Sequence, residues 1–253
     1  MSFRVTRYSR RSAVIAAFLI TALTGCGDKP NSTTALTPVT PTVTNADLLF
    51  YQEQEPGEEG STVRYVISPK FLRIDSGIAD DGYVLFDRQA QTVYSVSHSN
   101  QAVFAVMKQG LNGTLPVDIK ITVEKSEATD VPHVQGQAVV KLLLKANAKT
   151  CVEIYAAPGL LRSAVVAIKE YKAVLAAQHA STLENTPKEL RDPCFVAFDI
   201  FKSDEASQQG LIVREKQSDG KQRLLVDFKP GASVDAGLFV LPAGYKRQGQ
   251  KTP

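Results

Sequence analysis

Short runs of β-branched and aromatic residues, repeated at roughly ten-residue intervals, constrain the fold of this chain more than any other feature. Within each run apolar and polar residues alternate, and turn signals such as Asp80-Asp81-Gly82 separate the runs. The runs occupy residues 63–67, 71–75, 83–87, 91–96, 102–107 and 118–123. A period of two, broken by turns at this spacing, predicts an antiparallel meander with one dry and one solvated face.

The period changes between residues 158 and 180, where the apolar residues follow a helical stripe. The stripe consists of Leu161, Ala164, Val165, Ile168, Tyr171 and Leu175, and Pro158 suits the first turn of a helix. This amphipathic helix either packs on the open face of the sheet or forms a lid over a ligand cavity. Further strands are expected at 137–145, 151–155, 194–201, 210–216 and 223–228, with Ser218-Asp219-Gly220 as the last hairpin turn. The pattern therefore predicts an α+β fold built on an antiparallel sheet.

The amino-terminal segment has the three parts of a secretion signal. Four arginines precede an apolar run over residues 12–23, which is shorter than the roughly 20 residues needed to cross a bilayer. The run ends in Leu23-Thr24-Gly25-Cys26, which resembles the lipobox of bacterial lipoproteins, in which the cysteine is diacylated before cleavage. We therefore expect residues 1–25 to be the signal and Cys26 to carry lipid. The alternative is an ordinary signal peptide with an incidental cysteine, and the export route stays open.

A lipid-modified Cys26 would hold the chain at a membrane, because durable anchoring needs two or more acyl chains. Gly27 follows the cysteine, whereas the inner-membrane retention signal of such lipoproteins is an Asp, so the resemblance favours the outer membrane and its periplasmic face. Residues 26–46 are rich in Thr, Pro and Ser and are expected to form a disordered tether. Residues 47–247 would form one folded domain and 248–253 a disordered tail.

The charge of the mature chain gives no reason to expect a nucleic-acid partner. The whole chain carries a net charge of +3, but four arginines leave with the signal, and 25 basic residues then face 26 acidic ones. The mature chain is therefore close to neutral, without the basic excess that phosphate backbones attract.

Two cysteines remain once Cys26 is lipidated, namely Cys151 and Cys194. In an oxidising compartment two thiols usually pair where geometry permits, and closing a loop of about 40 residues stabilises a fold by roughly 3–4 kcal/mol. The alternative is two separate buried thiols. Neither cysteine belongs to a C-x-x-C pair, so thioredoxin-like chemistry is not expected.

No residue pattern indicates catalysis, a metal or a cofactor. His98, His133 and His179 are not at metal-ligand spacing from one another, and the chain has no G-x-S-x-G motif or Gly-rich phosphate loop. We therefore expect a protein that is not an enzyme. The aromatic residues are more informative, since six of them recur along the meander: Tyr65, Phe71, Tyr83, Phe86, Tyr94 and Phe104. One helix covers only part of such a sheet, so the remaining apolar surface must curl, bind a partner or hold a ligand.

The meander reads K-F-L-R-I-D, D-D-G-Y-V-L-F-D and Q-T-V-Y-S-V, and the chain closes on a D-x-x-L-F-x-L-P-A-G-Y-K ending from Asp235 to Lys246. These segments resemble the domain shared by outer-membrane lipoprotein carriers and receptors, and they look closest to its uncharacterised lipoprotein members. The resemblance covers residues 47–247. It implies an incompletely closed antiparallel β-barrel, a curved sheet with helix 158–180 on its concave side. The cysteines before and after the helix also look like this group.

Two functions follow as expectations. The first is a non-enzymatic envelope protein whose half-barrel binds an apolar ligand, a lipid or a lipidated chain, with ligand-contacting residues left undefined. The second is a structural or scaffolding module that docks an envelope protein complex through an exposed sheet edge or face.

Overall fold

A computed structural model of the chain describes residues 42–249. The expected signal, Cys26 and most of the expected tether lie outside the described residues. The strands are β1 (Val43–Gln54), β2 (Ser61–Ile67), β3 (Phe71–Asp75), β4 (Tyr83–Asp87), β5 (Thr92–Ser97), β6 (Ala102–Met107), β7 (Ile121–Glu127), β8 (Val140–Ala146), β9 (Lys149–Ala157), β10 (Leu211–Gln217), β11 (Gln222–Asp235) and β12 (Lys246–Gly249). The helical segments are α1 (Arg162–Leu183), α2 (Pro193–Phe195) and the shorter turns η1 (Lys188–Leu190), η2 (Val196–Phe201), η3 (Ala206–Gln209) and η4 (Ala236–Phe239).

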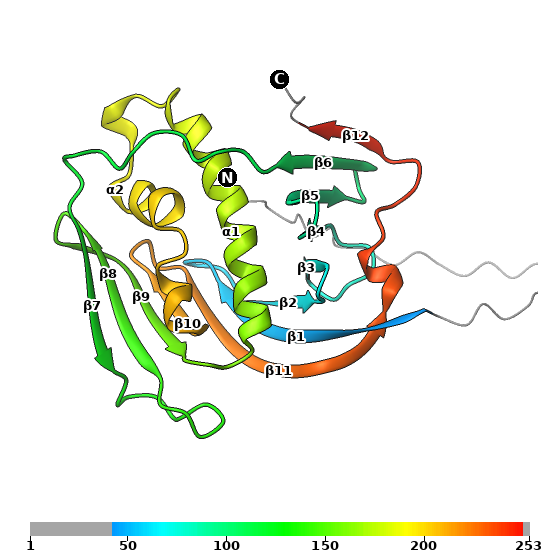
Figure 1. Ribbon diagram of the computed structural model, residues 1–253, viewed down its shortest axis with the longest axis horizontal. Helices are drawn as coiled ribbons and strands as arrows, with labels where there is room; N and C mark the ends of the chain where they lie inside the picture. The colour runs from blue at the N-terminus through cyan, green and yellow to red at the C-terminus, as the bar shows by residue number, and fades with distance from the viewer. Residues whose placement is uncertain (1–41, 250–253) are drawn as a thin grey trace, which may run out of the picture. The chain divides into compact units, whose positions relative to one another are not determined.

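All twelve strands belong to one sheet, in the order β12-β6-β5-β4-β3-β2-β1-β11-β10-β9-β8-β7. Neighbouring strands run antiparallel, except that β12 pairs with β6 in parallel. The sheet curves around α1, which crosses its inner side (Figure 1). The predicted α+β fold with a curved, largely antiparallel sheet is therefore confirmed, although the sheet is open, with β12 and β7 as its edges.

The central strand β1 was not among the expected strands. It pairs with β2 on one side and β11 on the other, so its backbone is hydrogen-bonded on both edges. Its first residues, 43–46, fall within the range expected to be tether, and β12 likewise overlaps the start of the expected tail. The Thr- and Asn-containing start of β1 reads as linker in sequence, and only its pairing with β11 makes it a strand.

The long helix is shifted from the expected range of 158–180. Leu161, just before the first helical residue, has a left-handed backbone conformation with φ of 42°, and Gly159 has φ of 76°. These two residues turn the chain out of β9, so α1 begins at Arg162 and continues to Leu183.

The strand expected at 194–201 is wrong, because this segment is helical. Pro193 occupies the first turn of α2, and the Asp192 side chain accepts a hydrogen bond from the Cys194 N–H. Asp followed by Pro is a strong start signal for a helix. The chain continues as the π-helical turn η2, whose Val196, Ala197, Phe198 and Ile200 are buried. The aromatic and β-branched composition of 194–201 reflects burial rather than extended backbone.

The two faces of the β1–β6 half are both apolar. On the inner face, where α1 lies, the buried residues include Leu49, Tyr51, Tyr65, Ile67, Leu72, Phe86, Val93 and Val106. On the outer face, Val66, Tyr83, Leu85, Val96 and Val103 pack with Phe239, Leu238, Leu241 and Tyr245 from the closing segment of the chain. The expected D-x-x-L-F-x-L-P-A-G-Y-K ending thus forms the outer cover of this half.

The β8–β10 half has its own inner core beneath α2 and η2. It joins Leu142, Leu144, Ile154 and Ile212 of the sheet to Val196, Ala197 and Phe198. α1 lies between the two cores, since it contacts β3, β5 and β6 on one side and β10 and η2 on the other.

Candidate functional site

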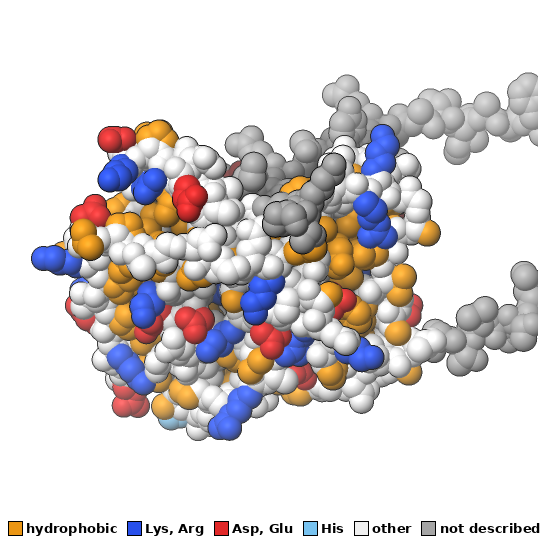
Figure 2. Space-filling model, turned by 45° about the horizontal axis from the view of Figure 1, so that its top comes forward, with side chains coloured by type: hydrophobic (Ala, Val, Ile, Leu, Met, Phe, Trp, Pro, Cys, Tyr) orange, Lys and Arg blue, Asp and Glu red, His pale blue; other side chains and the backbone are white. Residues whose placement is uncertain are grey.

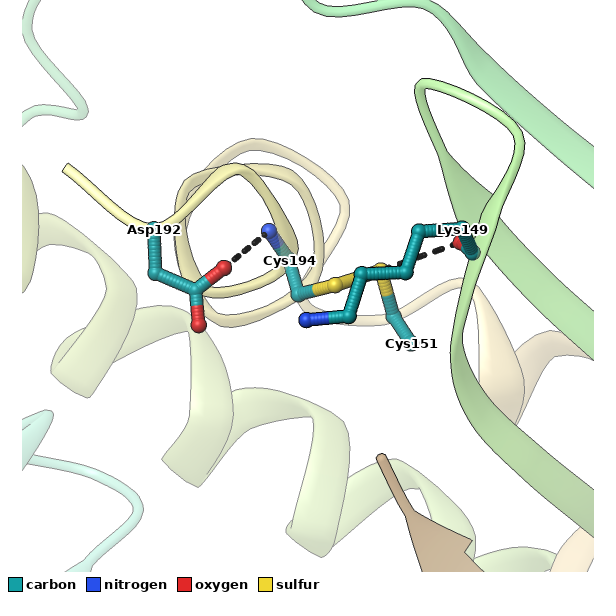
Figure 3. The surroundings of a disulfide bond; sticks show 4 residues. All are labelled: Lys149, Cys151, Asp192 and Cys194. Carbon is teal, nitrogen blue, oxygen red and sulfur yellow. Dashed lines mark hydrogen bonds between the residues drawn. A yellow bond between two sulfur atoms is a disulfide. The ribbon is translucent and has the colours of Figure 1, made fainter. Parts of the chain in front are cut away.

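Cys151 and Cys194 form a disulfide, with their Cα atoms 5.3 Å apart. Figure 3 shows the bond running from β9 to the start of α2, where the Asp192 carboxylate points to the Cys194 N–H. The predicted pairing is confirmed, and it fastens α2 and η2 to the β8–β10 half. Cys26, the predicted lipidation site, lies outside the described residues.

The three histidines do not form a site together. The His98 Nδ1 lies 2.8 Å from the Tyr245 hydroxyl, and so it helps to fix the closing segment against the outer face. His133 is exposed. His179 packs its ring against Phe195, and burial lowers its pKa. Within residues 42–249, no group of three or more His, Cys, Asp or Glu side chains is arranged to hold a metal ion. Over the same residues no helix has the length and apolarity to span a bilayer.

The space between α1 and the inner face is filled by side chains. Tyr51 and Tyr65 meet edge to face there, and Phe86 packs against Tyr171 of α1 at 6.1 Å between ring centroids. A gap of about 10 Å³ lies there, lined by Tyr51, Tyr65, Val165, Ile168, Ser207, Gly210, Leu211, Ile212 and Arg223. This is room for roughly one water molecule. An acyl chain would therefore need α1 to move outward.

A second, polar cleft of about 210 Å³ opens where β1 and β10 end and β11 begins. We call it the end cleft; its lining consists of Glu53, Gln54, Glu55, Glu215, Gln217, Lys221, Gln222 and Arg223. The antiparallel register brings these residues together, since Arg223 is paired with Glu53 of β1 and with Glu215 of β10. The lining carries both signs of charge. Lys and Arg are likewise interspersed with Asp and Glu over the face of the molecule drawn in Figure 2.

Arg223 organises the end cleft. Its Nη2 donates to the Glu215 carboxylate at 2.7 Å, its Nη1 donates to the Tyr65 hydroxyl at 3.1 Å, and its guanidinium lies 5.0 Å from the centroid of the Tyr51 ring. Burial alone would raise the pKa of Glu215, but the Arg223 guanidinium and the Lys172 ammonium outweigh burial and lower this pKa to about 2. The pair is therefore ionised at neutral pH.

Two further ionisable groups, Lys172 of α1 and Asp199 of η2, interact electrostatically with each other and with Glu215. Burial lowers the pKa of Lys172, although Glu215 and Asp199 partly offset this. The Asp199 carboxyl reaches solvent but is crowded by neighbouring protein, and this desolvation raises its pKa to about 6.

Sequence reasoning did not identify Arg223, Glu215 or Lys172. The sequence does contain a pairing signal for Glu215 and Arg223. Each lies four residues from Asp219, which belongs to the predicted hairpin turn. A hairpin centred on that turn places them opposite each other on one face. Lys172 carries no such signal, since its position opposite η2 depends on the packing of α1.

No family model and no curated protein matches the chain. Among solved structures, the chain is similar to PNGF-II in two crystal forms, at 10% sequence identity, with TM-scores of 0.39 and 0.38 and 81% of this chain covered. It spans about a third of PNGF-II, covering 31% and 32% of the two chains. It is also similar to an uncharacterized conserved protein from Thermus thermophilus, at 11% identity and a TM-score of 0.41, covering 82% of this chain and 91% of that one. Likeness at this level carries no functional argument.

Proposed function

We propose that this chain is a lipid-anchored, non-enzymatic envelope protein that binds an apolar chain between α1 and the inner face of its curved sheet. The observation that carries this proposal is the composition of the buried side of α1. Its fully buried residues are five alanines and one valine, whereas its larger apolar residues on the inner face are only partly buried: Val165, Ile168, Tyr171 and Leu175. The free energy of burial scales with apolar area, so such a helix is held less tightly than a leucine-rich one.

The polar contacts of α1 also favour a detachable helix. Arg88 donates to Glu170 at 2.6 and 3.2 Å, Ser163 donates to Asp47 at 2.8 Å, and Lys169 lies 3.5 Å from Asp204. All three contacts lie near the surface, where ion pairs contribute little. An acyl chain that entered between the inner face and an outwardly displaced α1 would gain about 0.8 kcal/mol per buried methylene. The aromatic inner face would then stay covered in both states.

Native mass spectrometry of the mature chain carrying Cys26→Ala, mixed with phospholipid and then separated from it, tests this proposal. We expect bound lipid in the wild-type sequence. In an Asp47→Cys/Ser163→Cys variant, joined by a short thiol crosslinker, uptake should fall at least about tenfold because α1 is fixed. The same variant without crosslinker is the control. A chain that takes up no lipid in any form contradicts the proposal.

The anchor has a separate test. We propose that Cys26 holds the domain at the periplasmic face of the outer membrane, as the likeness of its surroundings to a lipobox implies. Replacing Cys26 by Ala should release the protein into the soluble periplasmic fraction. Continued membrane retention of this variant would contradict the anchor while leaving the ligand proposal intact.

A second candidate is a docking module, and the edge strand β7 favours it. Residues Thr122–Glu127 of β7 are exposed, and only one edge of the strand is paired, with β8. An exposed edge can accept an extended strand of a partner protein. Crosslinking in cells should then give one stoichiometric protein partner, and Val123→Pro should abolish that product. An unchanged product would exclude β7 as the docking edge.

A further inference from the structure

The gap beneath α1 and the end cleft meet at one side chain. Of the residues that line the gap and those that line the end cleft, Arg223 is the one common to both. The gap side of Arg223 is apolar and aromatic, with Tyr51, Val165 and Ile168, whereas the cleft side is charged. A single ligand that occupied both spaces would have its apolar part under α1 and its polar part beyond the guanidinium.

The end cleft leaves unused hydrogen-bonding capacity of both signs. The Arg223 Nε is buried without a hydrogen-bond partner among the described residues, and such groups usually mark a missing partner. The Glu53 carboxylate accepts no hydrogen bond within residues 42–249, and its nearest cation is the Arg223 Nη1 at 4.0 Å.

From this geometry we infer that the apolar ligand carries a zwitterionic head, with an anionic group directed to Arg223 and Lys221 and an ammonium directed to Glu53 and Glu55. This inference rests on the proposed function, since it names the class of amphiphile that the site would take. A purely anionic head would face three carboxylates in the lining, and a purely cationic head would face Arg223 and Lys221. A head with both charges matches both sets of side chains.

The size of the end cleft agrees with a compact head. Its volume of about 210 Å³ is far larger than the 10 Å³ of the gap beneath α1. That volume accommodates a phosphate joined to a short amine. The charges of the lining also lie within a few ångströms of one another, as the contacts of Arg223 with Glu215 and Glu53 show.

The test compares amphiphiles that share one acyl chain and differ in the head. Titration calorimetry with the mature Cys26→Ala chain would use lysophosphatidylethanolamine, lysophosphatidylglycerol and a monoacylglycerol, each below its micellar concentration. We expect the zwitterion to bind at least about tenfold more tightly than the other two. Glycerophosphoethanolamine, which has the head without the chain, should bind at least about a hundredfold more weakly than the full amphiphile.

A matched pair of variants locates the effect. Glu53→Gln removes the free carboxylate from the lining and should reduce the preference for the zwitterion over the anion about fivefold, with monoacylglycerol binding unchanged. Glu58→Gln, in the exposed turn after β1, should change neither quantity. Equal affinity for all three heads overturns this inference and leaves the apolar proposal standing. If none of the three amphiphiles binds, the proposed function itself is overturned. If glycerophosphoethanolamine binds as tightly as the full amphiphile, the gap and the end cleft do not hold one ligand together.

Discussion

The β1–β6 half and the β8–β10 half of the sheet satisfy the same requirement, a covered apolar surface, by different means. In the first half both faces are apolar and both are covered, by α1 inside and by the closing segment outside. In the second half the inner face is covered by α2 and η2, and the disulfide holds them there.

The outer face of the second half is covered by the segment before β8, since Ala128 and Val139 belong to the same buried cluster as Tyr155, whose hydroxyl donates to Asp130 at 2.7 Å. There the ring of Tyr155 is flanked by Lys141 and Arg214, whose charged groups lie 5.2 and 5.3 Å from the ring centroid. Long cationic side chains cover apolar surface with their methylene stems and keep their charge in water. The first half therefore depends on segments that are distant in the chain, and the second on α2 and η2, which a crosslink over 43 residues holds in place.

The largest expected loss of stability comes from a substitution in the core of the first half. Phe86 is fully buried between the sheet and α1, and Phe86→Ala should lower the free energy of unfolding by about 4 kcal/mol, through lost burial and a cavity. Phe104→Ala is the matched control, because Phe104 is 45% exposed in the same half and should lose less than about 1 kcal/mol. Urea denaturation measures both. Equal losses would show that the interior beneath α1 is not a packed core.

Removing the disulfide should destabilise the second half. Cys151→Ala/Cys194→Ala should lower the free energy of unfolding by about 3–4 kcal/mol, because the unfolded chain regains the entropy of the closed loop. Amide hydrogen exchange should then rise in α2 and η2 more than in β2–β5. Uniform acceleration over both halves would mean that the crosslink stabilises the whole sheet and not one half.

The next prediction concerns the pH dependence of the unfolding free energy. It tests the ion pair between Glu215 and Arg223, where the two halves of the sheet meet. The pKa of Glu215 is lowered in the fold from 4.5 to about 2, so its contribution to stability is complete above pH 4.5 and is lost as the pH falls towards 2. Between pH 6 and pH 3 this loss is about 2 kcal/mol. Glu215→Gln should flatten the pH dependence of the unfolding free energy by that amount. An identical pH dependence in wild type and variant would contradict the ion pair.

The smallest expected effect concerns the contact that ties α1 to the first half. Glu170→Gln removes the ion pair with Arg88, and both side chains are partly exposed, so the loss should be at most about 1 kcal/mol. The same variant should take up lipid faster if α1 is the element that moves. Glu184→Gln, an exposed change just after α1, is the control and should alter neither stability nor uptake rate. Unchanged uptake in Glu170→Gln would count against movement of α1 at this end.

The meander was predictable because it is local. Alternation and turn residues place strands β2 to β6 near their observed bounds, and Asp219 and Gly220 mark the last hairpin. The segment 194–201 was mispredicted because burial from both sides of η2 selects the same aromatic and β-branched residues that strands favour. The Asp192-Pro193 start signal was present in the sequence and outweighs that composition.

The candidate site was less accessible to prediction than the fold. Glu215 and Arg223 could be paired across a predicted turn, but the third strand of that cluster, β1, joins them from about 170 residues away in the chain. Lys172 reaches the same cluster only because α1 crosses the inner face at one particular place. Contacts of this kind depend on how helices and strands pack against one another. The periodicity of the sequence does not predict that packing.

By itself the sequence determined the strand pattern of the first half, the amphipathic helix and the two cysteines that pair, because each depends on neighbouring residues or on simple chemistry. The tertiary structure alone decided that β1 joins the two halves, that the closing segment covers the outer face, and that Arg223 stands between an apolar gap and a charged cleft. The physical reason is that these features arise from long-range pairing and burial. No window of neighbouring residues contains both partners of such a contact.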